Sequence, residues 1–130
     1  MSESEKLQKP ATKHRILVID DDADFLELLR FRFVKKNCEY HTANNGEEGL
    51  ALAKTLIPEL ILVDIKMPRM NGYEFIRELK QDEKTRKIPV IVLTSFVMMR
   101  DMFGLEGVQD YIVKSADMSN LWTTVSRYLT

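Results

Sequence analysis

Carboxylate side chains follow two short apolar runs, and this pattern has a specific chemical use. Asp20 and Asp21 directly follow the run 16–19, and Asp64 directly follows the run 60–63. Parallel strands that end in acids place them at one edge of a sheet, where open α/β sheets bind their ligands. Carboxylates that lie close together resist ionising at the same time unless a cation lies between them. A hard divalent ion with a preference for oxygen ligands, such as Mg²⁺, would resolve that conflict.

Two more polar residues follow apolar runs in the same way. Thr94 ends the run 90–93, and Lys114 ends the run 111–113. Each residue alone is a weak signal, because an acid after a strand is often a helix cap and a lysine there is usually a solvated charge. Their joint appearance in this order, all at one sheet edge, is far more specific and predicts a single site.

The elements that must position this site alternate between strand-like and helix-like segments from about residue 14 onward. Near-continuous apolar strands separated by helices predict a parallel sheet covered on both faces, which is a doubly wound α/β fold. The expected strands are 15–19, 39–43, 60–63, 90–93 and 111–113, and the expected helices are 22–36, 47–56, 71–81, 97–103 and a last helix capped by Asp117 or Ser119.

Helical spacing also predicts which residues of each helix face the core. In the first helix, Asp22 is the expected N-cap, and Phe25, Leu28, Leu29 and Phe33 are expected to point inward. The remaining inward positions are Gly49, Leu52, Ala53, Leu56, Phe75, Ile76, Leu79, Leu121, Val125, Tyr128 and Leu129.

Composition restricts the class of protein. The 130 residues suit one domain with a single core, and 45% apolar residues indicate a globular chain. A net charge of -1 and the lack of a basic stripe do not favour nucleic acid or an anionic membrane as a partner. One cysteine, Cys38, excludes an internal disulfide and is expected to be a buried hydrophobe.

No stretch suits membrane insertion or a secretory signal, so we expect a cytoplasmic protein with a flexible tail over residues 1–13.

Four segments together make the chain resemble the receiver domain of two-component response regulators, the CheY-like family. They are 16–22 (ILVIDDD), 63–72 (VDIKMPRMNG), 89–95 (PVIVLTS) and 110–114 (DYIVK), and the second is the most specific. The resemblance covers about residues 14 to 130. It implies a flavodoxin-like, five-stranded parallel sheet in the order 2-1-3-4-5 with helices on both faces.

The resemblance also implies a role for the acidic cluster. Asp64 would be the phosphoacceptor that attacks a phosphohistidine and forms an acyl phosphate. Mg²⁺ would be the cofactor, with Asp20, Asp21, Asp64 and the backbone carbonyl of Lys66 as its protein ligands.

Three further residues carry roles in the family. Lys114 would pair with a phosphoryl oxygen, and Thr94 would move its hydroxyl onto the new phosphoryl group. Tyr111 would rotate inward as a switch, although a plain core aromatic fits it equally well. The chain would catalyse its own phosphorylation and dephosphorylation and no other reaction.

The resemblance predicts protein partners on both sides of the phosphoryl transfer. The donor would be a sensor histidine kinase or a phosphotransfer protein. The downstream partner would bind the surface made by helix 97–103, strand 111–113 and the last helix, and a phosphorylation-dependent homodimer is a further expectation. With only one helix expected after strand 111–113, we expect a receiver domain without an output domain, either as a stand-alone regulator or as a fragment of a longer protein.

Two departures from the family pattern affect these expectations. Ser115 follows Lys114 where the family usually has proline after a cis peptide, and a trans bond would re-aim Lys114. We expect Lys114 to reach the site even so, but less rigidly. The interval between Thr94 and Lys114 is about two residues short, and the apolar segment 96–103 fits either a tightly packed helix or a methionine-rich contact surface.

Two other functions compete with the phosphoacceptor. One is a Mg²⁺-dependent phosphohydrolase with Asp20 as nucleophile and Asp22 as acid, for which the chain lacks substrate-covering insertions. The other is a receiver-like scaffold that binds partners without phosphorylation. The set of Asp21, Asp64, Thr94 and Lys114 argues against the scaffold, and the Ser115 departure argues mildly for it.

Overall fold

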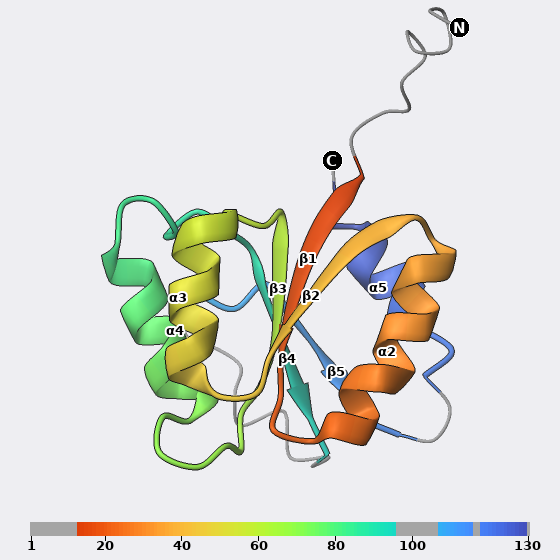
Figure 1. Cartoon of the computed structure of the whole chain (residues 1–130), viewed down its shortest axis with the longest axis horizontal. Coiled ribbons are helices and arrows are strands. Elements are labelled where there is room, and N and C mark those ends of the chain that lie inside the picture. The colour runs from red at the N-terminus through yellow and green to blue at the C-terminus, as the bar shows by residue number, and fades with distance from the viewer. Residues whose placement is uncertain (1–12, 96–106, 116–117, 130) are drawn as a thin grey trace, which may run out of the picture.

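A five-stranded parallel sheet in the order β2-β1-β3-β4-β5 forms the centre of the molecule (Figure 1). The computed structural model describes residues 13–95, 107–115 and 118–129. The predicted fold class and strand order are confirmed. The strands are β1 (His14–Ile19), β2 (Cys38–Ala43), β3 (Leu60–Asp64), β4 (Val90–Thr94) and β5 (Asp110–Val113), and the helices are α2 (Ala23–Lys35), α3 (Gly46–Leu56), α4 (Gly72–Gln81) and α5 (Leu121–Ser126).

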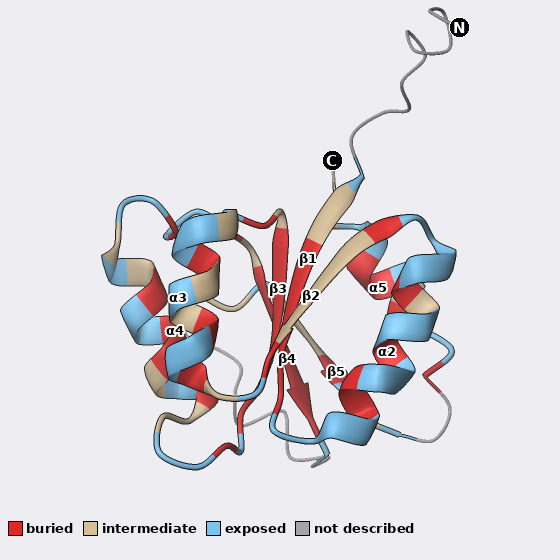
Figure 2. Ribbon diagram, in the orientation of Figure 1, coloured by how far each residue is buried: buried red, intermediate tan, exposed pale blue. Residues whose placement is uncertain are grey.

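Of the helices in the described part of the chain, two cover each face of the sheet, and alternating strand residues form a separate core under each pair. In β1, Ile16 and Val18 pack with residues of α2 and α5, whereas Leu17 and Ile19 pack with residues of α3 and α4. Figure 2 shows that the buried residues lie mainly on the central strands and on the helix sides that face them. Because the inner strands are covered on both faces, their segments 16–19, 60–63 and 90–93 are apolar at every position.

Side-chain caps fix where three of the helices begin. The Asp22 carboxylate accepts hydrogen bonds from the backbone N–H groups of Asp24 and Phe25, as predicted for the start of α2. Asn45 caps α3 through the N–H of Glu48. Asn71 forms a capping box at the start of α4, so α4 is fixed directly after the loop that follows β3.

Some of the predicted inward positions were wrong. Leu26, not Leu28, completes the buried face of α2, and Leu28 is 43% exposed. Both leucines fit the helical period beside Phe25, and the orientation of the helix on the sheet decides between them. Leu52 of α3 packs against the core as expected but is only half-buried, and Leu56 is also half-buried.

The last helix also differs from its prediction. Asn120 occupies the N-cap position of α5 and makes no side-chain capping bond, so the prediction of a Ser119 cap was wrong. Leu121 and Val125 are buried as expected, and Tyr128 and Leu129 pack against the core from beyond the end of the helix.

Several other expectations concern residues outside the described part of the chain. These are most of the tail 1–13, the helix at 97–103, the methionine-rich segment around it and the cap at Asp117. Within the described residues, Cys38 is buried as a free thiol, as predicted. None of the helices described is long and apolar enough to cross a membrane.

Candidate functional site

The strand register brings the predicted acids together at the carboxyl edge of the sheet. Ile19 of β1 pairs with Val63 of β3, so Asp20 and Asp64, the next residue on each strand, lie side by side. A carboxylate oxygen of Asp21 joins them, and the three oxygen atoms lie within 4.8 Å of one another. Asp20 and Asp64 are buried and Asp21 is exposed, so the cluster opens to solvent on the Asp21 side.

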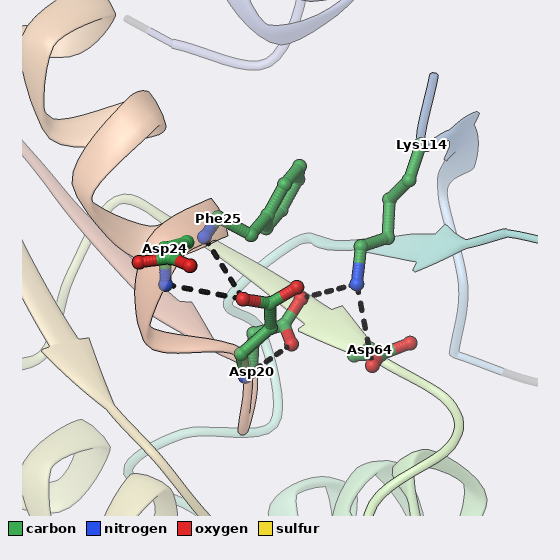
Figure 3. Close-up of polar contacts among 6 residues, drawn as sticks. Asp20, Asp24, Phe25, Asp64 and Lys114 are labelled. Atoms are coloured by element: carbon green, nitrogen blue, oxygen red, sulfur yellow. Dashed lines mark hydrogen bonds and ion pairs between the residues drawn. The ribbon is translucent and has the colours of Figure 1, made fainter. Parts of the chain in front are cut away.

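Lys114, which follows β5, extends its amine to both buried acids (Figure 3). Its Nζ donates a hydrogen bond to Asp20 Oδ2 at 2.8 Å and lies 3.6 Å from Asp64 Oδ2. The amine also lies 4.5 Å from the centre of the Phe25 ring, a cation–π contact that holds it over the start of α2. The second oxygen of Asp20 accepts the backbone N–H of Asp22 at 3.0 Å, so the orientation of Asp20 is fixed from two sides.

Burial and mutual repulsion raise the pKa of both buried acids above the ordinary value of an aspartate. Burial raises the pKa of Asp64 to about 6, and the charge of Asp20 adds to this, while Lys114 and the backbone N–H of Lys66 oppose it. Burial also raises the pKa of Asp20, against the hydrogen bond from Lys114. Burial alone would lower the pKa of Lys114, but its bond to Asp20 and the nearby acid charges raise it, so the amine stays protonated.

This donor set fits a hard divalent cation. Three carboxylates supply oxygen ligands within reach of one ion, and Lys114 contacts the two that are buried. A cation between Asp20 and Asp64 would lower the cost of ionising both acids.

The loop after β3 wraps closely around the backbone of Asp64. The N–H of Gly72 donates to the carbonyl oxygen of Ile65 at 2.9 Å. A Cβ atom on Gly72 would lie 2.8 Å from the carbonyl oxygen of Asp64 and 2.8 Å from Ile65 Cα, so a side chain does not fit there. Met67 is buried in the same loop, and Lys66 is exposed beside the acids.

Thr94 and Tyr111 lie on neighbouring strands but differ in burial. Thr94 is buried at the end of β4, and Tyr111 is half-buried against the core under α3 and α4. Tyr111 pairs with Val92, two residues before Thr94, so by strand alternation both side chains belong to the same face of the sheet. This arrangement is compatible with a coupled movement of the two residues, and their role as a switch stays a prediction.

Ser115 does not draw Lys114 away from the acids. No peptide bond in the described part of the chain is cis, so the bond between Lys114 and Ser115 is trans. The amine nevertheless lies within hydrogen-bonding distance of Asp20. The expectation that Lys114 reaches the site is confirmed, and its looser attachment stays untested.

Sequence reasoning missed the contact between Phe25 and Lys114. Phe25 was expected only as a core residue of the first helix, and it also supplies the ring beneath the site's lysine. No local signal joins positions 25 and 114, because their contact depends on β1 and β5 ending at the same edge of the sheet.

The strand order and the acid–lysine cluster at the carboxyl edge define the class of flavodoxin-like receiver folds. A model of the response regulator receiver domain matches residues 16–126, and the chain belongs to this family. Receiver domains are signalling modules of two-component systems and bind Mg²⁺ at an acidic pocket.

Relatives and solved structures agree with this assignment. The chain is 35% identical to PilH of Pseudomonas aeruginosa over 117 residues, which cover 88% of this chain and 97% of PilH. CheY4 of Vibrio cholerae has a similar structure, with a TM-score of 0.83 and 25% identity over 91% of this chain and all of CheY4. TrrA of Thermotoga maritima, solved in complex with Mg²⁺-BeF, gives a TM-score of 0.76 and 33% identity over 89% of this chain and 99% of TrrA.

Proposed function

We propose that this receiver domain takes a phosphoryl group onto Asp64 from a phosphohistidine of a sensor kinase or phosphotransfer protein. The observation that carries the proposal is the geometry at Asp64, whose carboxylate lies beside two other acids and 3.6 Å from the amine of Lys114. A nucleophile needs to be ionised, and a pKa of about 6 leaves most of Asp64 ionised at neutral pH.

The acids are well placed to hold the cation that such a reaction needs. Asp20, Asp21 and Asp64 would bind Mg²⁺ through carboxylate oxygens, and the carbonyl of Lys66 would add a backbone ligand. When bound, Mg²⁺ would neutralise the phosphoryl oxygens and favour an in-line transfer. The hydrogen bonds from Asp22 and Lys114 keep Asp20 oriented for this task.

In the transfer itself, a carboxylate oxygen of Asp64 forms a bond to phosphorus as the bond from phosphorus to the donor's histidine nitrogen breaks. The product is an acyl phosphate on Asp64 and a free histidine on the donor. Lys114 would then pair with a phosphoryl oxygen, because the amine already lies over the Asp64 carboxylate.

The same group would act as the switch. Thr94 would donate its hydroxyl to a phosphoryl oxygen, and Tyr111 on the same sheet face would follow it inward. Moving a two-state equilibrium from mostly off to mostly on takes about 5 kcal/mol of preference. A few charge-assisted hydrogen bonds of about 1.5–3 kcal/mol each would supply this preference.

The readout partner would be a protein that binds β5, α5 and the segment 97–103, which lies outside the described residues. The phosphorylation-dependent homodimer, the cytoplasmic location, the tail 1–13 and the domain bounds 14–130 remain predictions.

The phosphohydrolase alternative receives less support from the site. Its expected acid, Asp22, uses a carboxylate oxygen to cap α2. Its expected nucleophile, Asp20, has no exposed surface and is hydrogen-bonded to Lys114. The scaffold alternative would use the same surfaces without a phosphoryl group, and the experiment below distinguishes it.

The direct test is incubation of the protein with a small phosphodonor and Mg²⁺, followed by intact mass spectrometry. We expect one added phosphoryl group in the wild type and none in Asp64→Asn or in the wild type with excess chelator. Glu83→Gln, an exposed acid outside the site, is the matched control and should react like the wild type. An unmodified wild type would favour the scaffold, and equal labelling of Asp64→Asn would exclude Asp64 as the acceptor.

A further inference from the structure

The outer side of α2 exposes three large apolar side chains. Leu28 is 43% exposed, Phe31 is 69% exposed and Val34 is 56% exposed, whereas Phe25, Leu26, Leu29 and Phe33 form the buried side of the helix. Figure 2 shows α2 exposed along the side away from the sheet. The buried side of the helix already supplies Phe25 and Phe33 to the core, so the fold does not account for a second apolar side.

Four residues of this outer side form a stripe that we call the α2 stripe: Asp24, Leu28, Phe31 and Lys35. They are spaced by four, three and four residues, the spacing with which one helix packs along another. All four are exposed. The stripe therefore has an acid at its N-terminal end, a base at its C-terminal end and two large apolar residues between them.

Helix electrostatics explains part of this pattern. An acid in the first turn and a base in the last turn stabilise an isolated helix through its dipole. The dipole does not account for two exposed apolar residues between them. The neighbouring residues Glu27 and Arg30 form an ion pair, with 3.0 Å between Oε2 and Nε. Lys35 instead places its Nζ 5.8 Å from the centre of the Phe31 ring in the same chain, so its charge lies along the stripe.

We propose that the α2 stripe is the contact surface for a second copy of this chain, with the two α2 helices antiparallel. In this arrangement Asp24 of one copy lies opposite Lys35 of the other, and Leu28 lies opposite Phe31. Two-fold symmetry makes each of these contacts twice, which is the self-complementarity that an isologous dimer requires. A parallel pair would instead place acid against acid and base against base.

The size of the stripe sets the strength of this dimer. Thirteen residues of helix extend about 20 Å, and α2 has that length. A contact of this size buries less surface than a stable dimer of standard size, so the association should be weak and depend on protein concentration. It does not depend on a phosphoryl group, so it is independent of the proposed function.

Reversing the charge at either end of the α2 stripe tests whether two α2 helices pair antiparallel. Asp24→Lys alone and Lys35→Asp alone each place like charges opposite each other. We therefore expect each variant to raise the dissociation constant of the dimer, measured by sedimentation velocity, by about tenfold or more. An equimolar mixture of the two variants restores both pairs across a heterodimer and should associate at least as well as the wild type. Glu83→Lys, which makes the same charge change as Asp24→Lys at an exposed site elsewhere, should associate like the wild type.

Phe31→Ser removes the largest apolar contact and should also reduce association. Far-ultraviolet circular dichroism and thermal unfolding would show that each variant is folded. A wild type that remains monomeric up to about 1 mM, the upper range for weak specific contacts, would overturn the proposal. So would a mixture that associates no better than the single variants, because this result would mean that α2 does not pair antiparallel with itself.

Discussion

At the scale of single residues, the fold disfavours the ionised form of Asp64. The proposed phosphoryl transfer needs that ionised form. Its carboxylate is buried beside Asp20, and both effects raise its pKa to about 6 from an ordinary 3.8. The folded state therefore holds this proton more tightly than the unfolded state does. As a result, the free energy of unfolding should fall as pH rises from about 4 to about 6.

Asp64→Asn should remove this pH dependence and stabilise the protein at pH 7 in the presence of chelator. The pKa difference between about 6 and 3.8 sets an upper limit of about 3 kcal/mol on the gain. Denaturant titrations between pH 4 and 7.5 would measure it, with Glu83→Gln as a control that should change stability by less than about 0.5 kcal/mol. A variant that is no more stable than the wild type at pH 7 would mean that the Asp64 charge is already compensated.

Lys114 stabilises the folded protein, because its amine lies 2.8 Å from Asp20 Oδ2 and 3.6 Å from Asp64 Oδ2. Lys114→Met should destabilise the protein by about 2–4 kcal/mol at pH 7, since it leaves Asp20 buried without its charged partner. The loss should shrink as pH falls through about 6, because Asp64 then takes up a proton.

The matched control for this change is Lys54→Met, which removes an exposed lysine paired with Asp82 at 3.8 Å. Such surface pairs contribute about 0–1 kcal/mol, so this variant should remain near wild-type stability. Equal losses in the two variants, at all pH values, would show that the Lys114 contact is not specific.

At the scale of elements, the loop from β3 to α4 sets the position of Asp64, and Gly72 is where this loop comes closest to it. Gly72 and Gly46 are both first residues of helices and both buried, but their surroundings differ. An added Cβ meets the backbone of Asp64 and Ile65 at Gly72, and the flexible side chain of Met70 at Gly46.

Gly72→Ala should therefore cost about 2 kcal/mol or more and weaken Mg²⁺ binding, because backbone beside Asp64 has to move. Gly46→Ala should cost less than about 1 kcal/mol, because Met70 can change rotamer. Thermal unfolding and magnesium titration of the two variants would compare them, and similar costs would contradict the close approach at Gly72.

The elements also show what the sequence could and could not predict. The strands and the acids that end them were predictable, because buried parallel strands are apolar throughout and a polar residue marks their end. The choice of Leu26 over Leu28 was not predictable, because both fit the helical period and only the docking angle of α2 distinguishes them. The Phe25–Lys114 contact was also not predictable, because it joins residues 89 positions apart and depends on how the elements pack.

At the scale of the whole molecule, the fold is a rigid support that holds acids from two strands in one place. The unfolded chain does not hold these acids together, so Mg²⁺ should bind the folded state and raise its stability. At a concentration about 100 times its Kd, the gain should be about 2.7 kcal/mol. A melting-temperature comparison with and without chelator would measure it.

Asp21→Asn should lose most of this magnesium effect, because it removes an exposed ligand without disturbing the buried pair. Glu83→Gln should retain the full effect. Mg²⁺ should also bind more weakly as pH falls through about 6, since Asp64 must lose its proton to act as a ligand. Full stabilisation of Asp21→Asn by Mg²⁺ would place the ion elsewhere.

Locating the phosphoryl group on the chain tests the central claim most directly. Borohydride reduces an acyl phosphate of aspartate to homoserine, so treatment of the phosphorylated protein followed by peptide mass spectrometry marks the acceptor. We predict homoserine at position 64 alone, dependent on Mg²⁺ during phosphorylation. Homoserine at position 20 or 21, or a phosphoryl group that resists reduction, would contradict the account.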